Sequence, residues 1–165
     1  MELGTAIAGI LMLSCFIIPV IILGYIKKRN NKQIANILSD IAKQYNCLID
    51  EYEFSGKFII GIDKNTKVVF FFQKEDPYHT IKQINLSDFK SAKALIARRA
   101  NSTKDKSTHI DRLALAFQPL HKQQSTIELE FYNSEVSLDL NGELQTLEKW
   151  AGIISNQIDK KLQTV

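Results

Sequence analysis

The chain has 165 residues, of which 45% are hydrophobic and 24% are charged, and it contains only 7 Gly and 3 Pro. This composition is typical of a globular protein and excludes a fibrous repeat or a largely disordered chain. The length allows one ordinary domain plus a short additional segment. The formal net charge of +3 is small, and it argues against nucleic-acid binding, for which basic residues usually gather in large excess on one face.

The first 26 residues have the features of a membrane anchor. Leu3–Ile26 contains 24 residues without a charged side chain, and a helix of that length, rising about 1.5 Å per residue, extends roughly 36 Å and spans a bilayer. The basic cluster Lys27-Lys28-Arg29 follows this segment, whereas a cleaved signal peptide carries its basic residues before a shorter apolar core. The sequence therefore predicts one transmembrane helix in residues 1–26.

The charges around this segment predict its orientation. Lys27, Lys28, Arg29 and Lys32 follow the span, and no Lys or Arg precedes it. Basic residues beside a membrane helix favour the cytoplasmic side. We therefore expect a single-pass protein of the inner (plasma) membrane, with its N-terminus outside and its C-terminal domain in the cytoplasm.

The two cysteines agree with this location and raise one alternative. Cys15 lies within the apolar segment and Cys47 well beyond it, so they cannot form a disulfide framework, and reduced thiols are typical of cytoplasmic proteins. The run Met12-Leu13-Ser14-Cys15 loosely resembles a lipoprotein signal, in which the cysteine becomes lipidated. The residues after Cys15 stay apolar, however, whereas a lipidated protein normally turns polar there, and this favours the anchor.

Residues 27–46 form a predicted amphipathic helix. Its apolar residues recur at the spacing of one helix face, namely at Ile34, Ile37, Leu38, Ile41, Ala42 and Tyr45. Two roles are open for this helix. It either packs as a linker between the anchor and the domain or, because basic residues begin it, lies on the bilayer surface.

Residues 47–165 form the predicted soluble domain, and most of it has the texture of short strands. Phe58–Ile62 and Lys67–Gln73 flank the turn-forming run Asp63-Lys64-Asn65-Thr66, which predicts a β-hairpin. β-branched and aromatic residues between turn signals predict four further strands, at His79–Leu86, Lys90–Arg99, Ile110–Gln118 and Thr126–Tyr132.

A C-terminal helix is predicted from about Gly142 to Leu162, with Asn141 as its cap. Its apolar residues make one stripe, consisting of Leu144, Leu147, Trp150, Ala151, Ile154, Ile158 and Leu162. Trp150, the single tryptophan, is predicted to anchor this helix in the core rather than to stack on a ligand. Antiparallel strands sealed by one amphipathic helix indicate an α+β fold.

This order of elements resembles a known family. The stretches GIDKNTKVVFFF, INLSDFKSAKA, IDRLALAF, IELEFY and LEKWAGII resemble those of uncharacterised bacterial single-pass membrane proteins that join a membrane helix to a pleckstrin-homology-like (PH-like) domain. The resemblance covers Gly56–Ile158 and implies a small antiparallel β-barrel or sheet with a C-terminal capping helix. It also implies binding of lipids, peptides or proteins rather than enzyme activity. Phosphoinositide binding would need basic residues between the first two strands, and the turn here carries Lys64 and Lys67 beside Asp63.

No catalytic or metal-binding motif is present. The sequence lacks Cys-x-x-Cys, His-Glu-x-x-His and Gly-x-Ser-x-Gly. The three histidines, His79, His109 and His121, are dispersed, and the carboxylate pairs Glu51/Glu53 and Glu75/Asp76 stand in polar stretches where solvated charge is the usual explanation. We therefore expect no enzyme, no metal and no cofactor.

The candidate functional surface is a basic stretch, offset by Asp105 and Asp111 and consisting of Lys90, Lys93, Arg98, Arg99, Lys104, Lys106 and Arg112. Two functions remain open. The first is a scaffold or adaptor domain that presents a groove or sheet edge to an unidentified protein partner. The second is recognition of an anionic lipid or ligand through the basic stretch, which high salt would weaken because exposed charge attraction is screened.

Overall fold

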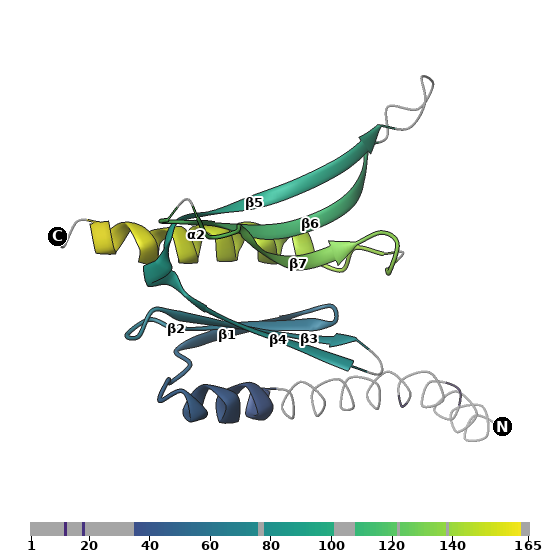
Figure 1. Ribbon diagram of the computed structural model, residues 1–165. Coiled ribbons are helices and arrows are strands. Elements are labelled where there is room, and N and C mark those ends of the chain that lie inside the picture. Colours follow the sequence, from purple (N-terminus) through teal and green to yellow (C-terminus); the bar gives the residue numbers. More distant parts are fainter. Residues whose placement is uncertain are drawn as a thin grey trace. The chain divides into compact units, whose positions relative to one another are not determined.

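A computed structural model describes residues 12, 18, 35–75, 78–100, 108–121, 123–137 and 139–162 (Figure 1). The predicted span Leu3–Ile26 lies outside these residues except for Met12 and Ile18, which are helical and exposed. Within the described part of the chain, no helix is both long enough and apolar enough to cross a membrane. Leu38–Val165 forms a compact unit of its own, and the architecture below is that of this unit.

The first sheet contains four antiparallel strands in the order β1-β2-β3-β4. These strands are β1 (Glu51–Ser55), β2 (Phe58–Asp63), β3 (Val68–Glu75) and β4 (Tyr78–Asn85). The predicted hairpin is confirmed as β2–β3, in which Asp63 pairs with Val68 across the turn. β1 was not predicted as a strand, and its position between the first hairpin and the C-terminal helix matters for the site described below.

The second sheet contains three antiparallel strands in the order β5-β6-β7. A short 3₁₀ helix, η1 (Leu86–Asp88), leads into it, followed by β5 (Phe89–Ala100), β6 (Thr108–Pro119) and β7 (Ile127–Asn133). These strands confirm the predicted ones to within a few residues at each end. β5 and β6 pair as far as Ala100 and Thr108, whereas β7 joins β6 only up to Arg112, so the β5–β6 ribbon continues beyond the third strand.

The C-terminal helix α2 (Glu143–Leu162) packs on the sheets, as predicted. Figure 1 shows it, in yellow, running along the β5–β7 sheet. Its stripe of Leu147, Trp150, Ile154 and Ile158 is buried in one core with residues of both sheets. Trp150 is fully buried, which confirms its role as a core anchor. The domain is therefore α+β, with two antiparallel sheets and a C-terminal helix.

The predicted amphipathic helix covers the other face of the first sheet, and its residues 35–44 lie within the described part of the chain and are helical. Leu38 and Ala42 of this helix are buried. A Cβ atom on Gly61 of β2 would lie 3.0 Å from Leu38 Cδ2 and 3.1 Å from Ile49 Cγ2. Gly61 thus allows these side chains to approach the strand closely, and all six residues of β2 are buried.

The turn between β2 and β3 is organised by Asp63. Its Oδ1 accepts the backbone N–H groups of Asn65 and Thr66 at 2.8 and 2.9 Å, and its Oδ2 accepts that of Leu48 at 2.8 Å. Burial by itself would raise the pKa of Asp63, but these hydrogen bonds outweigh it and the pKa is lowered. Lys67 closes the turn with φ +58°.

Candidate functional site

β1 lies at the edge of its sheet, and some of its backbone groups are paired by none of the described strands. The Lys74 N–H donates to the Lys57 carbonyl at 3.0 Å. The backbone N–H and C=O groups of the odd-numbered residues of β2 are therefore directed toward β3, and those of the even-numbered residues toward β1. Because antiparallel partners exchange their hydrogen bonds at alternate positions, Glu51, Glu53 and Ser55 pair with β2. The N–H and C=O groups of Tyr52 and Phe54 therefore point away from the sheet.

A groove of about 560 Å³ lies beside this edge, between β1 and the start of α2. The groove is lined by Glu53, Phe54, Ser55, Leu140, Asn141, Gly142, Leu144, Gln145 and Thr146. Leu140 is 38% exposed and Tyr52, on the outer side of the strand, is 54% exposed. Within β1, Tyr52 is exposed, Glu51, Glu53 and Phe54 are half-buried, and Ser55 is buried.

Glu53 links β1 to α2 through its side chain. Its Oε2 accepts a hydrogen bond from Trp150 Nε1 at 3.0 Å and an ion-paired one from Lys149 Nζ at 2.7 Å, while its Oε1 accepts one from Thr146 Oγ1 at 3.4 Å. Partial burial opposes ionisation of Glu53, but the three hydrogen bonds and the lysine charge prevail and lower its pKa. The same contacts raise the pKa of Lys149. Glu53 was predicted as a solvated charge, and the structure shows it instead as a link between β1 and α2.

Gly56, in the β1–β2 turn, lies against Glu143 at the start of α2. Glu143 is buried at the first position of α2 and its Oε2 accepts the Asn141 N–H at 2.5 Å. Gly56 has φ +54°, and any Cβ on it would collide with Glu143 Oε1. α2 begins at Glu143, so Gly142 and not the predicted Asn141 directly precedes it. The Asn141 Nδ2 donates to the Asp139 carbonyl at 3.5 Å.

The lining of the groove contains one carboxylate, Glu53, and this carboxylate is paired with Lys149. Among the described residues, Glu135, Asp139 and Glu148 are exposed and no cation lies within ion-pair distance of their side chains. These three carboxylates are not part of the lining.

The basic stretch is divided by the fold. Arg112 on β6 binds Glu130 at 2.6 Å and Glu128 at 2.9 Å, both on β7, and these partners raise its pKa. Arg99 on β5 binds Asp111 at 3.0 Å. Lys104 and Lys106 lie outside the described residues. Two of the five described residues of the basic stretch, Arg99 and Arg112, are therefore paired with carboxylates of the same sheet.

Lys90, Lys93 and Arg98 are exposed along β5, and no described carboxylate pairs with them. Lys90 and Arg98 are eight positions apart on one strand, which corresponds to about 26 Å at roughly 3.3 Å per residue. A register shift lies between Ala97 and Arg98. These three side chains are spread along the strand and do not converge on one point.

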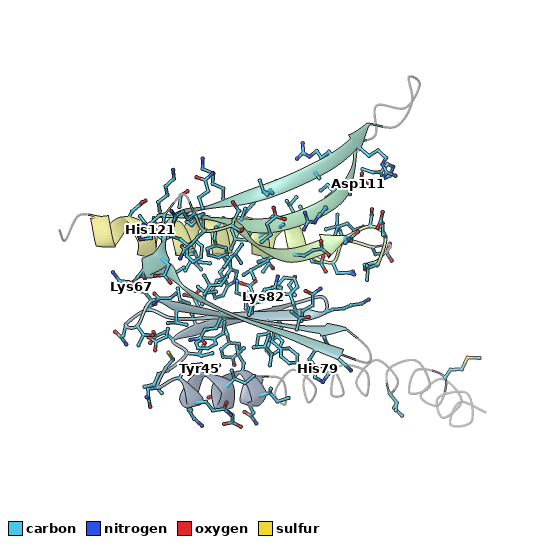
Figure 2. All side chains as sticks on the ribbon, viewed as in Figure 1. Tyr45, Lys67, His79, Lys82, Asp111 and His121 are labelled. Carbon is cyan, nitrogen blue, oxygen red and sulfur yellow. The ribbon has the colours of Figure 1, made fainter. Side chains whose placement is uncertain are left out.

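The other predicted chemistry is dispersed. His79 on β4, His109 on β6 and His121 after β6 are exposed, as expected, and Figure 2 shows His79 and His121 on different elements. Within the part of the chain that the structure describes, no group of His, Cys, Asp and Glu side chains could hold a metal ion. Cys47 is a free, buried thiol beside Thr66 Oγ1, and Cys15 lies outside the described residues.

Two other strand edges are partly covered by side chains. On β7, the Glu128 carbonyl accepts a hydrogen bond from Lys82 Nζ at 2.9 Å, and Lys82 is labelled in Figure 2. On β5, the Ala92 carbonyl accepts one from Ser155 Oγ of α2 at 3.1 Å. No comparable hydrogen bond reaches the backbone of Tyr52 or Phe54 from the described side chains. One outward carbonyl on each of β5 and β7 is therefore satisfied by a side chain, whereas the outward groups of Tyr52 and Phe54 on β1 accept or donate no described side-chain hydrogen bond.

Comparison of the chain with protein-family models, with curated proteins and with solved structures finds no match. Sequence reasoning missed the groove because it missed β1. The alternation of Tyr52 and Phe54 with Glu51, Glu53 and Ser55 was the available signal, since period-two alternation marks a strand with two different faces.

Proposed function

We propose that this protein is a membrane-tethered, non-enzymatic interaction module that binds a partner protein at the open edge of β1. The observation that carries the proposal is the unpaired backbone of Tyr52 and Phe54 beside a groove of about 560 Å³. An exposed strand edge with a neighbouring groove is a recurrent way to bind an extended peptide, because main-chain hydrogen bonds supply affinity and side-chain pockets supply specificity.

A PH-like domain is part of this proposal. The resemblance over Gly56–Ile158 implies a small antiparallel β-barrel or sheet with a C-terminal capping helix, and the two antiparallel sheets followed by α2 support it. The fold alone does not identify a ligand. The predicted membrane helix in Leu3–Ile26 would hold the domain at the bilayer and raise its effective concentration toward other proteins of that membrane.

Anionic lipid or ligand recognition is the second candidate. It is favoured by β5, which carries Lys90, Lys93, Arg98 and Arg99 without any acidic residue. Membrane attraction is about 1 kcal/mol per basic residue close to an anionic surface. The ion pair between Arg99 and Asp111, and the spread of the other three residues, reduce the support for this function.

A photo-crosslinking residue in the full-length protein separates the two functions. It is placed in intact membranes at Tyr52 on β1, at Lys93 on β5 or at Gln124, an exposed control position. A discrete protein adduct at Tyr52 that is absent at Gln124 is the expected result. If only lipid is captured, at Lys93, and high salt removes it, the anionic-lipid function replaces the interaction module.

A further inference from the structure

A second cavity, of about 290 Å³, lies apart from the groove beside β1. It is lined by residues of the β1–β2 turn, of β2, β3 and β7, of the segment after β7 and of the start of α2, and it shares only Asn141 with the lining of the groove. A water molecule takes up about 30 Å³ in the liquid, and ligand pockets begin at roughly 300 Å³. The cavity therefore has room for a small organic molecule.

Glu143 brings a buried carboxylate to this cavity. It is 4% exposed, and its Oε2 accepts the Asn141 N–H at 2.5 Å. No described group donates a hydrogen bond to its Oε1. Among the described residues, every fully enclosed side-chain nitrogen or oxygen atom has a partner, so Oε1 touches open space, and the cavity supplies that space. A buried carboxylate oxygen without a donor is costly, and a cationic donor compensates it most strongly.

The lining holds one more charge without a partner. Glu130 also lines the cavity, but its Oε2 accepts a hydrogen bond from Arg112 at 2.6 Å and its Oε1 accepts one from Asn133 Nδ2 at 3.3 Å. Lys57 is exposed in the β1–β2 turn, and its Nζ takes part in none of the ion pairs of the described residues. A carboxylate and an ammonium group thus line one cavity without pairing with each other. Charge complementarity favours an occupant that carries both signs.

The rest of the lining includes an apolar wall. Phe58 and Phe131 are buried with ring centroids 4.5 Å apart, and Val136 is 65% exposed. Tyr132 is 7% exposed, and its hydroxyl makes no hydrogen bond with any described group. A buried tyrosine hydroxyl normally has a partner. The cavity therefore offers apolar surface and a further hydrogen-bonding group beside its two charges.

We propose that this cavity binds a free α-amino acid with an apolar side chain. The ammonium group of the ligand pairs with Glu143, its carboxylate pairs with Lys57, and its side chain packs on the apolar wall. Within the described residues, no cluster of His, Cys, Asp and Glu could hold a metal ion in place of the ammonium group. The inference goes beyond the proposed function, which depends on the edge of β1 and not on this cavity.

The test compares three probes that differ only in their charged groups. They are L-phenylalanine, 2-phenylethylamine, which lacks the carboxylate, and 3-phenylpropionate, which lacks the ammonium group. Binding to the full chain in detergent micelles is followed by ligand-observed NMR titration, with protein-free micelles as the blank. We expect L-phenylalanine to bind at least about tenfold more tightly than 3-phenylpropionate, because Glu143 is buried. We expect an advantage of about threefold over 2-phenylethylamine, because Lys57 is exposed and solvent screens its charge.

Matched variants assign each charge to its residue. Glu143→Gln keeps an oxygen that accepts the Asn141 N–H and removes the charge, so it should weaken L-phenylalanine binding at least about tenfold without weakening that of 3-phenylpropionate. Lys57→Gln should weaken L-phenylalanine about threefold without weakening 2-phenylethylamine. The control is Glu148→Gln, an exposed carboxylate of α2 outside the lining, which should leave all three affinities within about twofold.

Three results would overturn the inference. Equal affinities of the three probes for the unchanged protein would show that neither charge is recognised, whether or not Glu143→Gln folds. Loss of L-phenylalanine binding in Glu148→Gln as large as that in Glu143→Gln would place the ligand elsewhere. If no probe binds at all while Tyr52 still crosslinks to a protein in membranes, this inference fails and the interaction module stands.

Discussion

The two sheets of the domain protect their outer faces in different ways. All six residues of β2 in the first sheet are buried, because the core covers one face and Leu38 and Ile49 cover the other at Gly61. In the second sheet, the outer side of β6 and β7 carries Arg112 with Glu128 and Glu130. One sheet is thus sealed by apolar contact and the other by ion pairs that remain partly in water.

This difference predicts unequal sensitivity to substitution. Overpacking an apolar contact, or leaving a cavity in it, lowers the free energy of unfolding by several kcal/mol. An exposed ion pair contributes only about 0–1 kcal/mol. It also bears on function. On the second sheet Arg99 and Arg112 are paired whereas Lys90, Lys93 and Arg98 are not, and the first sheet ends at β1, whose outward backbone groups are paired by no described strand.

The largest effect is expected at Trp150, which both sheets share. Trp150 is fully buried and lies in the core with residues of both sheets. Trp150→Ala should lower the free energy of unfolding by about 3–5 kcal/mol, measured by urea unfolding of the full chain in detergent and followed by far-ultraviolet circular dichroism. Trp150→Phe keeps most of the apolar volume but loses the hydrogen bond to Glu53. Its free energy of unfolding should lie between those of the unchanged protein and Trp150→Ala. A loss below about 1 kcal/mol for Trp150→Ala would contradict the shared core.

Gly61 tests the apolar seal of the first sheet. Gly61→Val forces Leu38 and Ile49 to move, since even a Cβ atom would approach them within 3.0 and 3.1 Å, and it should destabilise the fold by up to about 3 kcal/mol. The matched control is Gly152→Ala on α2, where a Cβ would meet nothing within 4 Å. That change should stabilise the protein by up to about 1 kcal/mol through helix propensity. Thermal unfolding of both variants measures the two effects. If Gly61→Val leaves the stability unchanged, the helix that contains Leu38 does not pack on β2.

The two carboxylates that fasten the first sheet should make stability depend on pH. Folding lowers the pKa of both Asp63 and Glu53, so their contribution is present above an unfolded pKa of about 4 and is lost as pH falls through the lower folded values. The melting temperature should therefore be flat near pH 7 and fall below about pH 5. Asp63→Asn with Glu53→Gln should cost up to about 2 kcal/mol at neutral pH and flatten the acid limb. An unchanged acid limb in the double variant would assign the pH dependence to other groups.

Local patterns were sufficient for the strongly periodic elements. The stripe through Leu147, Trp150, Ile154 and Ile158 predicted α2, and the Asp63 turn predicted the β2–β3 hairpin. Both depend on residues that are close in sequence, where helix and turn chemistry dominate. The expected membrane span lies outside the described residues and stays a prediction.

β1 and the groove could not be recognised in the same way. The inner side of β1 is polar because Glu53 accepts bonds from Lys149 and Trp150, nearly a hundred residues later in the chain. From sequence alone, a carboxylate in a strand is interpreted as solvated, because a partner that is distant in the chain cannot be recognised. The basic stretch shows the converse, since Arg99 and Arg112 look like free charges until the β5–β6 and β6–β7 pairings bring Asp111, Glu128 and Glu130 beside them.

The smallest effect is expected at Arg112, and it tests the outer side of the second sheet. Arg112 is 44% exposed although it binds two carboxylates, so solvent screens the pair and Arg112→Gln should cost less than about 1 kcal/mol. Because the change leaves Glu128 and Glu130 without their cation, the loss should shrink further in 1 M NaCl, whereas the loss caused by Gly61→Val should not respond to salt. Thermal unfolding at low and high salt measures both. A loss for Arg112→Gln as large as that for Gly61→Val would show that the second sheet depends on its ion pairs as strongly as the first depends on apolar contact.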